Sequence, residues 1–174
     1  VTFMFDDGTA TDYTLMLPLF QSKSIVGASA IITDYPGVQA GYMTWPQVTA
    51  LAAAGWEIAS HGKTHAYFTT FTDAQLRLEL AGAQADFAAQ GLTVRNLVYP
   101  YHDSNASVRS IAREYYRSAR GQAGFTGTSR LNLNLLETFN LRSVNIDDHT
   151  LLADYKDAVD DCETEGRWLI FYAH

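Results

Sequence analysis

The feature that most constrains the fold is a regular alternation of short apolar runs with longer segments of helical spacing. Runs rich in β-branched and aromatic residues predict strands over residues 1–5, 26–32, 56–59, 96–99, 141–146 and 168–172. Apolar residues at helical spacing predict helices over residues 13–21, 44–55, 72–91, 107–116 and 152–165. Strands that alternate with helices along a chain are typical of a parallel α/β sheet or barrel.

Length and composition exclude several classes of protein. With 174 residues, 47% of them hydrophobic, the chain can bury a substantial core, and we expect a single domain over residues 1–174. A net charge of -7 argues against a nucleic-acid or anionic-membrane partner. No run of apolar residues is long enough to span a bilayer, and no signal peptide is visible. The single cysteine, Cys162, excludes an internal disulfide and a Cys-rich zinc module.

Polar residues collect where four of the predicted strands end. The first strand ends in Asp6 and Asp7, and the last ends in His174. The other two are followed by the segments 61–65 (His-Gly-Lys-Thr-His) and 99–103 (Tyr-Pro-Tyr-His-Asp). Because the carboxyl ends of parallel strands lie on one side of a sheet, we expect these four segments to converge there.

Two of the converging residues have the spacing of metal ligands. His61 and His65 are four residues apart, which places both imidazoles on one side of a helical turn. Two histidines and one carboxylate leave positions open for water and substrate around zinc or a related divalent ion. Asp6 or Asp7 can supply the carboxylate. The set suits Zn best, and Co, Ni, Mn or Fe could occupy it.

These motifs together resemble a known family. Phe5-Asp6-Asp7-Gly8, Ser60-His61 with His65, Tyr99-Pro100-Tyr101 and Tyr172-Ala173-His174 resemble, in order and in spacing, the successive motifs of the polysaccharide deacetylase family (carbohydrate esterase family 4, the NodB-homology domain). The resemblance implies a distorted (β/α) barrel and metal-dependent removal of N- or O-acetyl groups from an acetylated glycan. It also favours an extracellular or cell-envelope location.

The resemblance implies a role for each motif residue. The metal triad of the family falls on Asp7, His61 and His65. Its catalytic base falls on Asp6 and its catalytic acid on His174. The oxyanion that forms on the acetyl group would be held by the metal and by the backbone N–H of Tyr101.

The third and fourth motifs depart from the family pattern. The third motif of the family often carries an arginine that orients the base, and here Val98 stands at that position. Arg142, from a later strand, is the candidate to replace it, and the alternative is that Arg142 is a surface arginine at a strand edge. His102 stands where the family has glycine, and we expect it to be a solvent-exposed loop residue. The aspartate of the fourth motif has no clear counterpart, although Asp147 and Asp148 lie in its region.

Two other functions use the same residues differently. A catalytically silent glycan-binding barrel could retain the fold, but such a protein has no need of a second carboxylate beside its metal. A glycoside hydrolase could use Asp6 and Asp7 as its carboxylate pair. Such enzymes, however, hold their two carboxylates on opposite sides of the scissile bond, about 5 Å or more apart. A glycoside hydrolase would also leave His61 and His65 without a role.

Overall fold

Seven parallel strands form the centre of the molecule. The computed structural model describes residues 1–121, 130–132 and 137–174. Every pairing between neighbouring named strands is parallel, in the order β5-β4-β3-β2-β1-β7-β6. The strands are β1 (Thr2–Phe5), β2 (Ala28–Ile31), β3 (Glu57–Ser60), β4 (Asn96–Val98), β5 (Ser118–Arg120), β6 (Val144–Asn145) and β7 (Ile170–Ala173).

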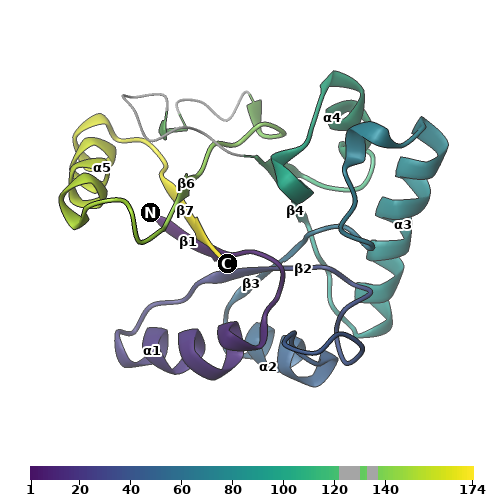
Figure 1. Ribbon diagram of the computed structural model, residues 1–174, viewed down its shortest axis with the longest axis horizontal. Coiled ribbons are helices and arrows are strands. Elements are labelled where there is room, and N and C mark those ends of the chain that lie inside the picture. Colours follow the sequence, from purple (N-terminus) through teal and green to yellow (C-terminus); the bar gives the residue numbers. More distant parts are fainter. Residues whose placement is uncertain (122–129, 133–136) are drawn as a thin grey trace.

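Helices surround the strands on the outside (Figure 1). Helices α1 and α2 lie along one side, α3 and α4 lie along the next, and α5 lies apart from them on the opposite side. Their bounds are α1 (Leu17–Ser22), α2 (Trp45–Ala53), α3 (Asp73–Ala89), α4 (Ala106–Ala112) and α5 (Leu152–Glu165). One π-helical turn, η1 (Asp12–Met16), leads into α1, and two short 3-10 turns are η2 (Phe68–Thr70) and η3 (Pro100–His102). None of the described helices is long and apolar enough to cross a membrane.

The strand β5, at one end of the strand order, pairs with the segment that precedes β6 at the other end. Leu141, just before β6, forms a parallel bridge with Arg120 of β5. Its N–H donates to the Ala119 carbonyl at 3.0 Å, and its carbonyl accepts from the Gly121 N–H at 2.9 Å. Because β5 and β6 stand at opposite ends of the strand order, this bridge closes the sheet into a distorted (β/α) barrel, as the sequence predicts.

The alternation of side chains along the strands separates two cores. Phe5, Ile31 and Ile58 point outward and pack with the helices, where Phe20 and Trp56 complete an aromatic cluster. The opposite faces of the strands form a cluster of smaller side chains, which are Met4, Ala28, Ala30, Ala59, Val98, Leu141 and Ile170. Small residues on this inner face allow the strands to curl around a narrow interior.

Strand β5 is not predicted from the sequence. Its three residues, Ser118–Arg120, carry neither an apolar run nor a clear alternation. They follow α4 in the segment 117–140, part of which lies outside the described residues. The six predicted strands and five predicted helices are present with shifted ends, and the first predicted helix begins with the π-helical turn η1.

Candidate metal centre

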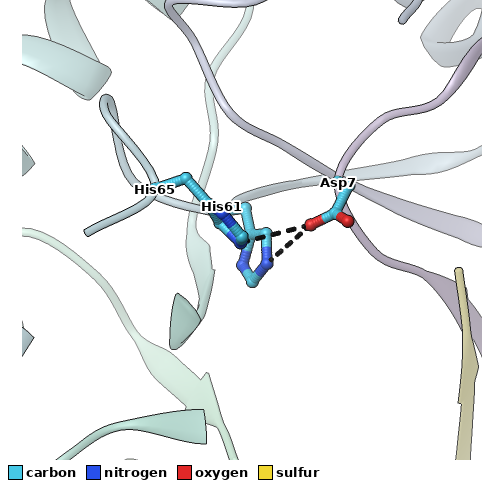
Figure 2. Close-up of side chains that lie close together, drawn as sticks. All are labelled: Asp7, His61 and His65. Carbon is cyan, nitrogen blue, oxygen red and sulfur yellow. Dashed lines mark ion pairs between the residues drawn. The ribbon is translucent and has the colours of Figure 1, made fainter. Parts of the chain in front are cut away.

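Asp7, His61 and His65 meet at the carboxyl ends of β1 and β3 (Figure 2). Asp7 has a left-handed backbone, with φ 71°, and the chain turns there. Gly8 continues the turn at φ 71°, where a Cβ would lie 2.8 Å from Cδ1 of Ile31. His61 directly follows β3, and a left-handed backbone at His65 returns that side chain toward the first histidine.

The three side chains direct their ligand atoms at one point. Oδ1 of Asp7 lies 3.2 Å from Nε2 of His61 and 3.3 Å from Nε2 of His65. Nδ1 of His61 donates to the Val98 carbonyl at 2.9 Å, which leaves the Nε2 lone pair facing Asp7. Oδ1 of Asp7 is itself buried, and it has no hydrogen-bond partner in the part of the chain that the structure describes. A buried carboxylate oxygen between two imidazole nitrogens fits a divalent cation with the two-histidine, one-carboxylate set.

The groups around Asp7 favour its ionised form, which is the form that can bind a metal. Burial raises the pKa of this carboxyl, but the imidazoles of His61 and His65 lower it more strongly. The net pKa of Asp7 is therefore well below its usual range. Asp7 is accordingly a carboxylate at neutral pH, as a metal ligand must be.

The neighbouring carboxylate, Asp6, has a different environment. It is buried, and its Oδ1 forms an ion pair with Nη2 of Arg120. Arg120 reaches Asp6 from β5 and is buried as well, with its guanidinium 4.7 Å from the centre of the Tyr172 ring. Nη1 of the same arginine donates to Oγ of Ser143 at 3.1 Å. The side chains of the two adjacent aspartates therefore have different partners: Asp7 contacts the histidines and Asp6 contacts Arg120.

The sequence predicts Arg142 beside Asp6, whereas the structure pairs Asp6 with Arg120. The backbone of Arg142 is bound instead by the Asn132 side chain, which accepts from its N–H at 2.8 Å and donates to its carbonyl at 3.0 Å. Arg120 is the last residue of β5. The rule that polar residues at strand ends collect at the site would have identified it, had so short a strand been recognised.

The segment after β4 contains two consecutive left-handed residues. Tyr101 and His102 have φ values of 55° and 57°. His102 is half-buried and faces the Tyr172 ring at 5.0 Å, so the expectation that it is exposed is wrong. Burial, and to a lesser degree the charge of Arg120, lowers the pKa of His102 to about 4. Tyr99 is buried and donates from its hydroxyl to the Phe139 carbonyl at 3.0 Å, as expected of a core residue.

His174 stands at the same end of the barrel as the two aspartates. It follows β7, whose Ala173 is the register partner of Phe5 and accepts from the Asp6 N–H at 2.8 Å. The imidazole is exposed and lies 5.8 Å from the ring of Tyr172. Asp147, from the region of the missing fourth motif, instead accepts from the backbone N–H groups of His149 and Thr150 at 3.0 and 2.8 Å.

The loop that carries both histidines is held by a residue of α3, Glu79. This buried carboxylate accepts from the backbone N–H groups of Lys63 and Thr64, both at 2.7 Å, and from the Thr64 hydroxyl at 3.1 Å. These hydrogen bonds satisfy the backbone between the two ligands and fix the path that brings His65 back to His61. Glu79 could not be predicted from the sequence, because a single acidic residue within a helix has no local pattern that indicates a functional role.

We predict that Glu79→Gln weakens metal binding about 10-fold, because an uncharged amide holds the loop less firmly than a carboxylate. The measurement is competition with a zinc-binding dye. Glu114→Gln is the matched control, since Glu114 is exposed and pairs only with Arg77 among the contacts described. An affinity equal to that of the control would show that Glu79 does not position the ligands.

Asp12 is a further buried carboxyl near the site. It lies in the π-helical turn η1 and accepts from the Ser29 hydroxyl at 2.6 Å and the Thr9 hydroxyl at 3.1 Å. Burial raises the pKa of Asp12 to about 7 against these hydrogen bonds, and the charges of Asp6 and Asp7 add to the rise.

We predict that Asp12 makes the stability of the metal-free protein fall as the pH rises. The unfolded chain loses the Asp12 proton near pH 3.8, whereas the folded chain keeps it to about pH 7, so the folded state binds more protons in between. Between pH 4 and pH 7, the free energy of unfolding measured with denaturant should fall by as much as about 4 kcal/mol more than that of Asp12→Asn. Parallel pH profiles for the two proteins would contradict this account of Asp12.

Comparison with known proteins identifies the family. A family model described as polysaccharide deacetylase matches residues 1–118, which is more than half of the chain. A search of curated proteins gave no significant match. A polysaccharide deacetylase from Bacillus cereus superposes with a TM-score of 0.77 and 19% identity over 90% of this chain and 50% of its own.

Two further solved structures share the fold. A de-N-acetylase from Aggregatibacter actinomycetemcomitans has a TM-score of 0.75 and 20% identity over 90% of this chain and 74% of its own. A family 4 carbohydrate esterase from Streptomyces lividans, solved with acetate, has a TM-score of 0.63 and 20% identity over 97% of this chain and 89% of its own. The present chain thus spans half of the Bacillus cereus protein and most of the Streptomyces one. With a matching family model, a distorted (β/α) barrel and an Asp-His-His group at its rim, the chain belongs to the polysaccharide deacetylase family.

Proposed function

We propose that this chain is a metal-dependent hydrolase that removes acetyl groups from a polysaccharide or oligosaccharide. The observation that carries the proposal is the divergence of the two adjacent aspartates. Asp7 joins His61 and His65 in a group suited to a divalent ion, while Asp6 is bound by Arg120 and is not needed as a ligand. A metal group with a second, separately oriented carboxylate beside it suits hydrolysis by an activated water.

Each residue then has a distinct chemical task. When bound at Asp7, His61 and His65, a divalent ion supplies Lewis-acid polarisation of the acetyl carbonyl and lowers the pKa of water at the site. Asp6 accepts the proton of the attacking water, and Arg120 keeps the Asp6 carboxylate in one orientation. The backbone N–H of Tyr101 stabilises the developing oxyanion. His174 gives a proton to the leaving amine, which is a poor leaving group until it is protonated.

The ligand set supports zinc as the metal. Imidazole nitrogens suit Zn, Co, Ni and Fe alike, and one carboxylate does not discriminate strongly among these ions or Mn. A three-residue set that leaves positions open for water and substrate is typical of catalytic zinc. We therefore propose Zn as the resident ion, with the other four as functional substitutes.

The substrate follows from the family and from relatives of known description. One structural relative is described as a de-N-acetylase and another as a family 4 carbohydrate esterase in complex with acetate, which supports removal of N- or O-acetyl groups. We propose an acetylated glycan as the substrate of this chain, and an extracellular or cell-envelope setting in which such glycans are found.

The alternative of a silent glycan-binding barrel accounts for less of the site. Burying an arginine and an aspartate together is costly unless both are well paired, and a binding module gains nothing from the pair beside its metal. The glycoside hydrolase alternative is weaker still, because Asp7 is committed to the two histidines and does not face Asp6 as a partner carboxylate.

We predict that Asp6→Asn and Asp7→Asn separate catalysis from metal binding. Asp6→Asn should lower acetate release by about 100-fold or more while the metal affinity stays within about 3-fold of the unaltered protein, because the amide oxygen can still accept a hydrogen bond from Arg120 but cannot take up the proton of the attacking water. Asp7→Asn should lose both, since it removes a metal ligand. Acetate is measured with a coupled assay and bound metal by elemental analysis after gel filtration.

Thermal unfolding of both variants is the control for folding, since Asp6→Asn leaves Arg120 with an uncharged partner. Unchanged acetate release by a folded Asp6→Asn protein would eliminate Asp6 as the base. Metal retention by Asp7→Asn at the original affinity would eliminate the proposed triad.

A further inference from the structure

A row of aromatic rings leads from the metal centre to the surface. The ring centres of His61 and His65 are 4.9 Å apart, those of His65 and Tyr101 are 4.5 Å apart, and those of Tyr101 and Tyr67 are 4.1 Å apart. The last two rings are nearly parallel, at 13°. Tyr67 and Tyr101 are 52% and 48% exposed, so the row ends in two tyrosines that water reaches.

Both tyrosines are held firmly in place. Tyr101 is fixed by its left-handed backbone, which turns the ring onto His65. Tyr67 directly precedes the turn η2, which is anchored by the fully buried Phe68. The carboxylate of Asp103 ties the two segments together, because it accepts from the Thr69 N–H at 2.7 Å and from the Thr69 hydroxyl at 3.0 Å. The pair is thus a preformed surface, built from the loops after β3 and β4.

The chemistry of this surface suits one kind of ligand. Tyr101 contacts both His65 and Tyr67, so Tyr67 is the last ring of the row that starts at the histidines. Exposed aromatic rings on rigid supports are costly to leave in water and are typical of ligand sites. A tyrosine ring offers an apolar face and one hydroxyl without charge, which matches the apolar face and the hydroxyl groups of a neutral pyranose. The contact with His65 joins this surface to the metal centre without a break.

We propose that Tyr67, supported by Tyr101, is an aromatic platform that stacks against a sugar unit beyond the one being deacetylated. The inference rests on the proposed function and deepens it, because it makes the substrate an uncharged oligosaccharide or polysaccharide rather than a single acetylated sugar. Tyr67 determines preference for longer substrates and takes no part in the chemical step.

The platform predicts an effect that depends on substrate size. Tyr67→Ala should raise KM about 10-fold for acetylated tetrasaccharides, with kcat within about 2-fold, because one aromatic stacking contact is lost. Tyr67→Phe should retain the stacking contact and remain close to the unaltered protein. The small ester 4-nitrophenyl acetate cannot reach the platform, so all three proteins should hydrolyse it equally. The probes are the N-acetylglucosamine tetramer and an acetylated xylotetraose, with acetate as the readout.

A control variant and the pattern of results distinguish sugar stacking by Tyr67 from a role in supporting His65. Leu78→Ala removes another exposed apolar side chain, 75% exposed on α3, and should change nothing. If Tyr67→Ala slows the small ester and the tetrasaccharides alike, or weakens metal binding, the stack only supports His65 and the platform is refuted. An unchanged KM for the tetrasaccharides also refutes it. Failure of the unaltered protein to release acetate from either tetrasaccharide would instead overturn the proposed function, and the platform with it.

Discussion

The buried ion pair between Asp6 and Arg120 is the interaction on which the arrangement of the site depends. It joins the end of β1 to the end of β5, strands that stand four places apart in the sheet order. Two charges removed from water are stable only when their geometry and remaining hydrogen bonds are good, and here Ser143 and the Tyr172 ring complete the surroundings of the guanidinium. Arg120 holds Asp6 on one side, and the left-handed backbone of Asp7 directs the next carboxylate to the histidines. Two neighbouring residues of identical chemistry therefore have two different surroundings, an arginine for Asp6 and two histidines for Asp7.

Carboxylates also join the loops after β2, β3 and β4, where they bind backbone N–H groups and side chains close to His61 and His65. Glu79 binds the backbone between His61 and His65, and Asp103 binds Thr69. Lys63 lies in the loop that carries both histidines and forms ion pairs with Asp34 at 2.7 Å and with Asp86 at 2.6 Å. It thereby joins this loop to the loop after β2 and to α3. Rigid support of this kind keeps metal ligands in place before the ion arrives, which favours both affinity and a defined geometry.

The sequence predicts the barrel and the grouping of an aspartate with His61 and His65, because both follow from local signals. Apolar runs give the strands, and the rule that chemistry lies at strand ends places Asp6, Asp7, His61 and His65 together from the order of residues alone. Arg120 and Glu79 could not be predicted in this way, for two different reasons. Arg120 belongs to a strand of three residues that carries no pattern, and Glu79 is a helix residue whose role exists only through contacts with a distant loop. From the sequence, His102 is expected to be an exposed loop residue, and only the structure shows it half-buried with its ring 5.0 Å from that of Tyr172.

The central claim is that Asp7, His61 and His65 bind a catalytic ion, and metal titration of the chelated protein tests it most directly. Zinc would be added in steps to the metal-free 174-residue protein while acetate release from an acetylated oligosaccharide is recorded. We predict that release is absent after chelation and rises with added zinc to a plateau at about one equivalent, as a single three-residue site requires. Full acetate release by the chelated protein, or one tightly bound equivalent of zinc without any release, would contradict the account.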